Sequence, residues 1–550
     1  MTSAPRSRSF IRSWRLAVAA ATITSVAVAT VPAGAEPNFG GVKFLPALAG
    51  TSLVNLPAYG SISCVASTCT AVGGSNNAFG NEGGKAAIIT ENAGTWSAPI
   101  GVTFPGDHVV PTTGDGFSDA LLKVSCWQVG DCVAVGQYGV SKNFGVPAGD
   151  LTVSTPMVMT ETSGTWSSAS ALALPVLADS LGGPTGLSCD ASGHCSVVGY
   201  YATIDEATGN PTFHGFFANN NAGPWTAAVD TPAVPGTPSV IAPTGISCAD
   251  STDCTATIAA KFATTDTTYR ITETAGVWGS AVALAPPTGR VFEGMAISCP
   301  SATGCIVVGQ SSSSAHNLDN NLHLVPAFSV EHAGTWGAAG QLPQPMLSPV
   351  TGGGVFGAIT CSGSSMCEAV GAATTGATGL GAIPMAATWN GTKWSSLGLY
   401  NALLHAGSAT ATASNFLDVS CTSTTSCTTL GFTGTGTINS SNVPYFAFST
   451  GINPTMSVAA PSSPVGLKAA LAPKTATISW QPPYSDGGSS VTSFLVTATS
   501  PGLAKKLCLS TTLSCKLTGV AKGHAYHVSI QSRNGVGFSK PSLVLTFVGH

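Results

Sequence analysis

The fold is decided by the stretch Ser61-Ile62-Ser63-Cys64-Val65-Ala66-Ser67-Thr68-Cys69-Thr70-Ala71-Val72-Gly73, in which a close cysteine pair lies between two short runs. Both runs contain β-branched residues and are bounded by small or polar residues, which predicts two short strands. Cysteines at this spacing pair locally in an exported chain. The stretch therefore predicts an antiparallel hairpin closed by a disulfide.

The same hairpin recurs along the chain. Seven cysteine pairs have members five or six residues apart: Cys64/Cys69, Cys126/Cys132, Cys189/Cys195, Cys248/Cys254, Cys299/Cys305, Cys361/Cys367 and Cys421/Cys427. Their first members lie 62, 63, 59, 51, 62 and 60 residues apart, and such a period indicates a structural repeat. An eighth pair, Cys508/Cys515, lies outside the repeats, and no cysteine is left over.

Each repeat contains two further strands. A polar loop after the hairpin leads to a third strand that ends in a Gly-x-Trp turn, lengthened by one residue in the sixth copy. A fourth strand begins at the tryptophan, which is Trp96, Trp166, Trp225, Trp278, Trp336 or Trp394. Four short strands form a small antiparallel sheet, which cannot bury both faces alone.

We expect an all-β chain in which residues 36–458 form a seven-bladed β-propeller, because seven sheets arranged radially cover one another. The alternative is a linear array of small independent β domains. It is disfavoured because about 60 residues provide too little core to stand alone. The seventh repeat lacks the Gly-x-Trp signature, and Gly41-Val42-Lys43-Phe44-Leu45-Pro46 is similar to fourth-strand text. This segment would complete the last blade, with the strand before each first cysteine innermost.

Two resemblances support this architecture. Ile-Ser-Cys followed by Cys-x-Ala-Val-Gly and Gly-Thr-Trp resembles a cysteine-pair repeat of secreted proteins from high-GC bacteria, over about residues 37–455, and that repeat carries no settled activity. The turn at residues 90–96 resembles the Asp-box hairpin of sialidase-type propellers, although it is one residue short and has Asn92 in the place of the aspartate. That resemblance implies a fold-stabilising turn and carries no implication for catalysis.

The N-terminal 35 residues have the pattern of a signal peptide. Four arginines precede an apolar run at residues 16–31, and Ala33-Gly34-Ala35 provides a cleavage site. No later stretch reaches the about 18 apolar residues that a transmembrane helix needs, so we expect no membrane span in the mature chain. The protein is therefore predicted to be secreted, either extracellular or associated with the cell envelope.

Residues 459–550 form a different domain. Ile478-Ser479-Trp480-Gln481-Pro482-Pro483, Asp486-Gly487-Gly488-Ser489 and Asn534-Gly535-Val536-Gly537 occur in order, and the series is similar to a fibronectin type III β-sandwich. The resemblance implies that Trp480 and Tyr526 are core residues. Cys508 and Cys515 depart from the usual cysteine-free pattern of this family, and we interpret them as a local clip between neighbouring strands.

Composition narrows the range of partners. Only 8% of the residues are charged and the net charge is −4, which disfavours nucleic-acid binding. The charge is uneven, because 23 of the 24 acids lie before residue 460, whereas seven lysines and one arginine lie beyond it. A basic end domain suits an anionic envelope polymer. The alternative is that these charges only aid solubility or contact with the acidic repeats.

Metal, redox and enzyme signatures are weak. His194 is the only histidine in the cysteine hairpins, which disfavours zinc, and no Cys-x-x-Cys occurs. Gly-x-Ser-x-Gly and His-Glu-x-x-His are absent, and the repeats hold two arginines where a sialidase-like site needs three. A glycosidase needs only two carboxylates across a cleft, so this activity stays open.

The candidate binding residues lie in the second-to-third-strand loops and the blade connectors, which would share one face of the propeller. They are Asp115, Asp119, Asp205, Glu206, Arg290, Glu293 and Asp319. Such an acidic rim suits sugar hydroxyls, a cationic partner or calcium, although no cofactor is required. The alternatives are solvated loop acids, and for Arg290 with Glu293 a salt bridge. Glu91, Glu161, Glu273 and Glu331 recur near the tryptophan turn, and we interpret them as repeat structure.

Two functions follow as hypotheses. The first is a non-enzymatic binding protein that presents propeller loops to a glycan or a protein, with the fibronectin-like domain as a spacer or second adhesive module. The second is an extracellular glycoside hydrolase that degrades polysaccharides, because fibronectin-like modules often accompany such enzymes. The second rests on this association alone.

Overall fold

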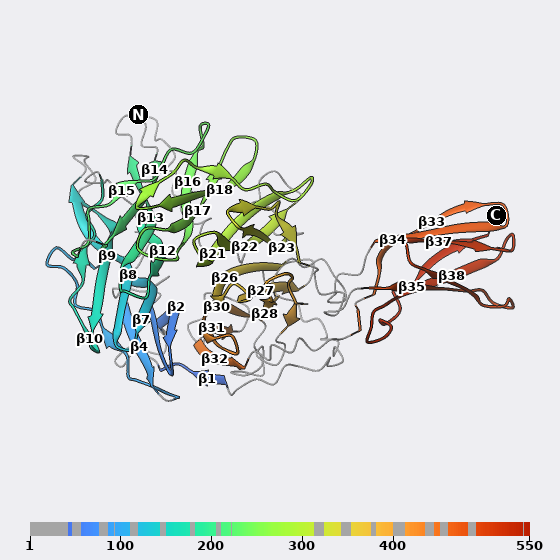
Figure 1. Ribbon diagram of the computed structural model, residues 1–550, viewed down its shortest axis with the longest axis horizontal. Coiled ribbons are helices and arrows are strands. Elements are labelled where there is room, and N and C mark those ends of the chain that lie inside the picture. Colours follow the sequence, from blue (N-terminus) through green and yellow to red (C-terminus); the bar gives the residue numbers. More distant parts are fainter. Residues whose placement is uncertain are drawn as a thin grey trace, which may run out of the picture. The chain divides into compact units, whose positions relative to one another are not determined.

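A computed structural model of the chain describes residues 42–46, 57–75, 86–92, 94–110, 119–143, 150–175, 182–204, 211–221, 223–312, 324–342, 354–375, 381–395, 397–399, 413–434, 445–451, 460–461, 463–481, 491–542 and 544–549. The elements in these ranges are β-strands (Figure 1). The chain divides into two compact units, the first ending at Ile452 and the second consisting mostly of Asn453–His550. Within the described ranges, no helix is long and apolar enough to cross a membrane.

The first unit consists of seven repeated sets of antiparallel strands, which we number repeats 1 to 7. A parallel pairing of Ala382 with Ala413 joins the strands of repeats 6 and 7 into one eight-stranded sheet. Repeats 1 to 3 contain β2 (Pro57–Val65), β3 (Thr68–Ser75), β4 (Ala86–Asn92), β5 (Thr95–Trp96) and β6 (Ile100–Gly101); β7 (Ala120–Gln128), β8 (Asp131–Asn143), β9 (Asp150–Thr162), β10 (Thr165–Trp166) and β11 (Ser170–Ala171); and β12 (Gly183–Cys189), β13 (Cys195–Ile204), β14 (Pro211–Asn219) and β15 (Val229–Asp230).

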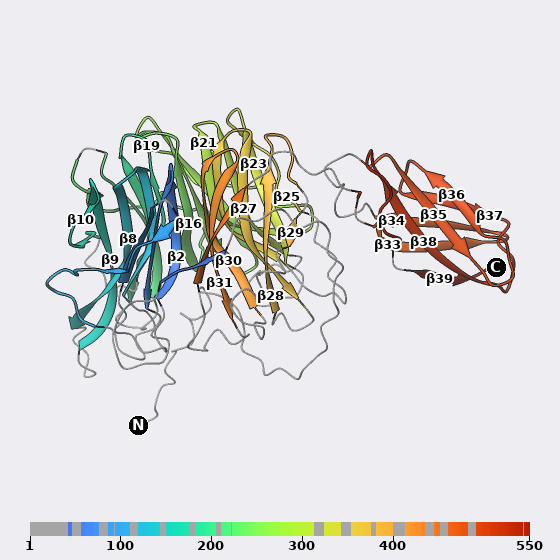
Figure 2. The ribbon, with the colours of Figure 1, turned by 90° about the horizontal axis from the view of Figure 1, so that it is seen from below.

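Repeats 4 to 7 follow the same order. They contain β16 (Val240–Cys248), β17 (Cys254–Lys261), β18 (Asp266–Thr274), β19 (Val277–Trp278) and β20 (Val282–Ala283); β21 (Val291–Ser301), β22 (Gly304–Ser312), β23 (Val325–His332), β24 (Thr335–Trp336) and β25 (Gly340–Gln341); β26 (Gly354–Gly363), β27 (Met366–Thr375), β28 (Gly381–Trp389) and β29 (Gly398–Leu399); and β30 (Ala413–Ser423), β31 (Ser426–Gly434) and β32 (Tyr445–Gly451). Figures 1 and 2 show each sheet beside the next in sequence order.

The N-terminal strand β1 (Val42–Phe44) belongs to the sheet of repeat 7. It pairs antiparallel with β32, with Val42 opposite Phe448 and Phe44 opposite Phe446. The Lys43 ammonium donates to the carbonyl oxygen of Gly94 at 2.5 Å, in repeat 1. The expected pairing of this segment with the last repeat is thus confirmed, and the segment also contacts the first repeat.

Every first strand carries a β-bulge four residues before its first cysteine. The bulged residues are Gly60, Leu122, Thr185, Thr244, Met295, Gly357 and Leu417. The bulge brings a carbonyl oxygen of the first strand against the glycine of the Ala-Val-Gly motif. A Cβ on Gly309 would lie 1.9 Å from the carbonyl oxygen of Glu293. The motif therefore ends in glycine because the bulged partner strand leaves no room for a side chain.

The Gly-x-Trp motif forms the hairpin turn between the third and fourth strands. Ser163, Ala275 and Ala333 have φ angles of 49°, 51° and 49°, and the glycine after each has a φ near 80°. Two consecutive residues with positive φ define a type I′ turn, which matches the twist of a two-residue hairpin. The turn chemistry thus explains why glycine precedes the tryptophan by two positions.

The described structure contains eight disulfides, which join the cysteines that the spacing pairs. They are Cys64–Cys69, Cys126–Cys132, Cys189–Cys195, Cys248–Cys254, Cys299–Cys305, Cys361–Cys367, Cys421–Cys427 and Cys508–Cys515. The first seven each join the first and second strands of one repeat. They clip each hairpin at the end where the two strands meet.

Hydrogen bonds through the Ser-Cys motif link one repeat to the next. The backbone N–H of the first cysteine donates to the serine hydroxyl of the preceding repeat: Cys126 to Ser63 (2.9 Å), Cys189 to Ser125 (3.1 Å), Cys248 to Ser188 (3.0 Å), Cys299 to Ser247 (2.8 Å) and Cys361 to Ser298 (3.0 Å). The N–H of Cys64 in repeat 1 donates in the same way to Ser420 of repeat 7 (2.8 Å). Repeat 7 is thus bonded to repeat 1.

The apolar core lies between neighbouring sheets. Val72 and Ile88 of repeat 1 pack in one buried cluster with Leu121 and Met157 of repeat 2. Leu430 of repeat 7 shares a second cluster with residues of repeat 1. Burial of apolar area is the main stabilising contribution to folding, so these sheets depend on one another and are not independent domains.

The second unit is a sandwich of two sheets. One contains β33 (Val465–Ala472), β34 (Thr475–Gln481) and β37 (Ser514–Thr518), and the other contains β35 (Ser493–Thr499), β36 (Lys506–Ser510), β38 (Ala525–Arg533) and β39 (Leu545–Val548). Trp480 and Tyr526 are buried in its core, as expected. The Cys508–Cys515 disulfide joins β36 to β37 and therefore links the two sheets of the sandwich.

Candidate functional site

Three of the seven candidate residues lie in the described part of the chain. They are Asp119, just before β7, and Arg290 and Glu293, at the start of β21. Asp115, Asp205, Glu206 and Asp319 lie outside the described residues, as does the predicted signal peptide at residues 1–35. These candidate residues can therefore be examined only at repeats 2 and 5.

Asp119 is fully buried and binds the connector that leads into repeat 2. Its Oδ2 lies 2.8 Å from Nε2 of His108, and its Oδ1 accepts the backbone N–H of Gly139 at 2.9 Å. Burial raises the pKa of this carboxyl, and the hydrogen bonds from His108 and Gly139 oppose the rise. His108 in turn stacks on Phe104 at 4.3 Å. Asp119 thus anchors the connector rather than facing solvent.

Two buried tyrosines hold further connector acids. Tyr138 and Tyr201 each stand six residues after the second cysteine of their repeat, and both are fully buried. The Tyr138 hydroxyl donates to Asp107 at 3.1 Å, and the Tyr201 hydroxyl donates to Asp230 at 2.6 Å. Burial and the neighbouring carboxylates raise the pKa of both phenols. These residues act as paired structural anchors in repeats 2 and 3.

Sequence reasoning did not identify His108, Tyr138 or Tyr201 as part of this region. The two tyrosines share one position relative to the cysteines, which was a usable signal. His214 stacks on Tyr201 at 4.8 Å, and its Nε2 lies 3.1 Å from the Thr203 hydroxyl. No sequence spacing links that histidine to the tyrosine, because they come from adjacent strands.

Arg290 and Glu293 both contact β22 of repeat 5. The Arg290 guanidinium donates to the Ser311 hydroxyl from Nε (3.2 Å) and to the Ser311 carbonyl oxygen from Nη2 (2.9 Å). The Gln310 amide donates to Oε2 of Glu293 at 2.5 Å. Burial raises the pKa of Glu293, and the hydrogen bond from Gln310 offsets only part of this rise. The structure thus bonds these two residues to adjacent residues of β22, where the sequence suggested a salt bridge between them.

A small pocket lies beside Glu293. Its lining includes Lys261 and Asp266 at the facing ends of β17 and β18, together with Phe292 and Glu293 of β21. Asp266 raises the pKa of Glu293 and Lys261 lowers it, so charges of both signs act on one carboxyl. The lining of this pocket thus contains both acidic and basic groups. Asp119 belongs to a different repeat and contributes nothing to it.

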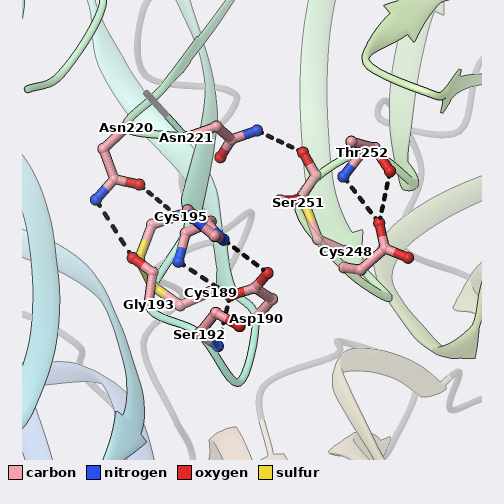
Figure 3. Close-up of polar contacts among 12 residues, drawn as sticks. Cys189, Asp190, Ser192, Gly193, Cys195, Asn220, Asn221, Cys248, Ser251 and Thr252 are labelled. Atoms are coloured by element: carbon pink, nitrogen blue, oxygen red, sulfur yellow. Dashed lines mark hydrogen bonds and ion pairs between the residues drawn. A yellow bond between two sulfur atoms is a disulfide. The ribbon is translucent and has the colours of Figure 1, made fainter. Parts of the chain in front are cut away.

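The opposite ends of the strands carry the disulfide hairpins and a second set of polar groups (Figure 3). In repeat 3, Asp190 accepts the backbone N–H groups of Ser192 (2.8 Å) and His194 (2.9 Å). Burial of Asp190 acts to raise its pKa, but these hydrogen bonds outweigh burial and lower it. Asn220 accepts the N–H of Cys195 at 2.6 Å. These contacts fix the hairpin of repeat 3.

No group of three or more histidine, cysteine, aspartate or glutamate side chains in the described ranges is arranged to hold a metal ion. The loop residues His316 and His323, which have ligand-type side chains, lie outside those ranges.

Comparison with known proteins identifies the second unit. Residues 460–548 match the family of fibronectin type III domains. Among solved structures, the chain is similar to the twitchin kinase region from C. elegans (26% identity, TM-score 0.16, covering 16% of this chain and 17% of that one). It is also similar to titin kinase with its flanking domains (21% identity, TM-score 0.16, covering 16% of this chain and 17% of that one). A further similar structure is the FN5 domain of Drosophila Lar (18% identity, TM-score 0.14, covering 16% of this chain and 96% of that one).

The matched part thus spans only about a sixth of the length of the two kinase-containing chains. The two-sheet sandwich with buried Trp480 and Tyr526 agrees with the family match. The C-terminal part of this chain, residues 460–548, is a fibronectin type III domain.

Proposed function

We propose that the seven sheets close into a seven-bladed β-propeller, and that the protein is an extracellular, non-enzymatic binding protein. Its propeller loops would present polar groups to a glycan or a protein. The fibronectin type III domain would serve as a spacer or as a second adhesive module, with its excess of positive charge directed at an anionic envelope polymer.

The observation that carries the proposal is the bonding between repeats 7 and 1. Besides the bond from Cys64 to Ser420, Oδ2 of Asp418 accepts the N–H of Ile62 at 3.0 Å and the hydroxyl of Ser61 at 2.8 Å. Leu430 packs with the core of repeat 1. This bonding supports a ring, because a linear array would leave the first and the last repeat apart.

The disulfides indicate an extracellular protein, because such bonds persist in oxidising compartments. Eight are present, and the fibronectin type III domain agrees with this location. Export through the signal peptide at residues 1–35 and association with the envelope are part of the proposal. They await analysis of the mature N-terminus in culture supernatant and cell-wall fractions.

A binding role is favoured over catalysis because the connector acids are occupied. Asp107, Asp119 and Asp230 accept hydrogen bonds from buried side chains or from the backbone, and so hold the connectors in place. These hydrogen bonds give the three acids a structural role. These acids therefore form a rigid base for loops that bind.

A specific observation also favours the glycoside hydrolase as a second candidate. Glu293 and Asp266 line one pocket, whose volume of about 10 Å³ would have to widen to admit a sugar, and burial raises the pKa of Glu293. Under this candidate Glu293 would protonate the leaving oxygen and Asp266 would act as the second carboxylate. The Gln310 amide would orient the acid.

One screen separates the two candidates. The full chain is passed over insoluble cellulose, chitin and peptidoglycan, and both retention and released reducing sugar are measured. Retention without release supports binding, and its loss in Glu293→Gln or Asp266→Asn, but not in the neighbouring Thr264→Ala, would assign the pocket. Sugar release that both carboxylate variants abolish would overturn the binding proposal, and absence of retention on every polymer would direct the search to protein ligands.

A further inference from the structure

One glutamate position recurs next to the tryptophan turn in four repeats. Glu91, Glu161, Glu273 and Glu331 each pair across the strands with the tryptophan of their own repeat. Because the position is the same, the four carboxyl groups form an internal comparison within one protein. They differ in which charges act on them.

Two of the four have a cation supplied by the chain itself. The Lys43 ammonium lies 3.6 Å from Oε1 of Glu91. Glu331 is influenced by Arg270, which extends from β18 of the preceding repeat and lies 5.7 Å from the ring centre of Trp336. In repeats 1 and 5 a basic side chain therefore acts on the glutamate, whereas in repeat 2 burial and the acid Asp131 raise the pKa of Glu161.

Glu273 of repeat 4 has the same position but the opposite surroundings. Its side chain is 2% exposed, and among the described residues its Oε2, like that of Glu331, has no hydrogen-bond partner. Burial is the main cause that raises the pKa of Glu273 to about 7. The negative charges of Asp253 and Asp250, on the cysteine hairpin of the same repeat, raise it further. A buried carboxyl beside two further acids is costly unless a cation joins it.

A second acceptor without a partner lies against the same hairpin. Asn221 of repeat 3 donates from Nδ2 to the carbonyl oxygen of Ser251 at 2.5 Å (Figure 3). Its buried Oδ1 has no partner among the described residues. Both atoms are hydrogen-bond acceptors, so a group that binds to them must be a donor. The exposed Asp250 is fixed at the rim by the N–H and hydroxyl of Thr252, at 2.8 and 2.9 Å.

The equivalent of Arg270 in the preceding repeat explains why repeat 4 lacks its own cation. Phe217 occupies the position of Arg270 on the third strand of repeat 3. Phe217 pairs across the strands with Val198, and Arg270 pairs with Thr257. Val198 and Thr257 each follow the second cysteine of their repeat by three residues, so the two positions are equivalent. Phe217 stacks on Trp278 at 3.9 Å, nearly parallel. The apolar side chain keeps the tryptophan covered but supplies no charge.

We propose that the cysteine hairpin of repeat 4 binds a lysine or arginine side chain of a partner protein, with Glu273, Asp253 and Asn221 as its acceptors. An arginine offers five N–H donors, which suits several acceptors at once. Val277, 71% exposed beside Trp278, offers an apolar surface for the methylene stem. An organic cation fits better than a metal ion, because the described residues contain no three-ligand group of metal-binding geometry. This site lies at the hairpin ends, apart from the loop pocket at Glu293.

The experiment measures binding of a nonapeptide with three arginines to the full chain by isothermal titration calorimetry. The control peptide replaces each arginine with citrulline, which keeps the shape and removes the charge. We expect affinity at least tenfold higher for the arginine peptide. We expect Glu273→Gln and Asp253→Asn to lower it at least tenfold, and Glu331→Gln to leave it unchanged, because that glutamate already has Arg270.

Phe217→Arg gives the sharpest variant, because it supplies repeat 4 with the internal cation that repeat 5 has. It is expected to abolish peptide binding, whereas Phe217→Leu, which removes the same ring without adding charge, is expected to retain it. Equal affinity for the arginine and citrulline peptides would overturn the proposal. So would undiminished binding by both Glu273→Gln and Phe217→Arg.

Discussion

Glu368 gives the strongest test of how the sheets bury polar groups. It lies on β27 of repeat 6, is 3% exposed, and accepts a hydrogen bond from the Thr388 hydroxyl at 2.7 Å. Burial raises its pKa to about 8, and the Thr388 bond opposes part of the rise. The folded protein therefore holds this proton more tightly than the unfolded chain, in which the pKa is 4.5.

The sign of the pH dependence follows from this difference. The contribution of Glu368 to stability is complete below pH 4.5, falls as the pH rises, and is lost once the pH passes about 8. The full shift corresponds to about 5 kcal/mol at about 1.4 kcal/mol per pKa unit. Glu368→Gln keeps the shape and a hydrogen-bonding group but does not titrate. The unfolding free energy of this variant therefore does not undergo the fall with pH that Glu368 causes.

The assay is urea unfolding of the full, oxidised chain at several pH values from 4 to 9. Hydrogen exchange of the amides in β27 and β28 reports on this repeat. We expect the unfolding free energy of the natural protein to fall by about 5 kcal/mol more than that of Glu368→Gln over this range. Glu91→Gln, whose partner Lys43 is at the surface, serves as the control. Parallel pH curves for the natural protein and Glu368→Gln would refute the reasoning.

Three further changes test other parts of the fold. Gly309→Ala places a Cβ 1.9 Å from the Glu293 carbonyl and should destabilise the first unit by about 1–3 kcal/mol in urea unfolding, whereas Gly101→Ala, with no atom within 4 Å, should be neutral. Ser188→Ala leaves the N–H of Cys248 without its acceptor and should cost about 1–3 kcal/mol in the same assay; no change would mean that the bond is dispensable. Replacing Cys508 and Cys515 by serine opens a short loop and should lower the unfolding free energy of the fibronectin type III domain by about 2–3 kcal/mol, and an unchanged transition would contradict this.

Much of the local structure was predictable because it depends on residues close in sequence. The cysteine spacing predicts the hairpins and their disulfides, and the Gly-x-Trp motif predicts the third turn. The bulges were not predictable, because residues as different as Gly60, Leu122 and Met295 occupy them. A bulge is defined by backbone register and places little demand on side-chain type.

The candidate site was less predictable, because its contacts join different strands and connectors. Asp119 was selected as a loop acid, but the structure buries it against His108 and Gly139. Arg290 and Glu293 were interpreted as a salt bridge or as part of a binding mouth, whereas the structure bonds Arg290 to Ser311 and Glu293 to Gln310, contacts that depend on the pairing of β21 with β22. Glu273 was interpreted as repeat structure like Glu331. The two glutamates differ because Arg270 acts on Glu331, whereas the equivalent position in the preceding repeat of Glu273 is the uncharged Phe217.

The central claim is that the seventh sheet packs against the first and closes the ring. Photo-leucine incorporated into the full chain tests it directly, because Leu430 is fully buried in a cluster with Ile62 and Ile89. Irradiation followed by peptide mass spectrometry should recover cross-links from the peptide containing Leu430 to peptides covering residues 57–75 or 86–92. Cross-links from Leu430 confined to residues 413–451 would contradict closure.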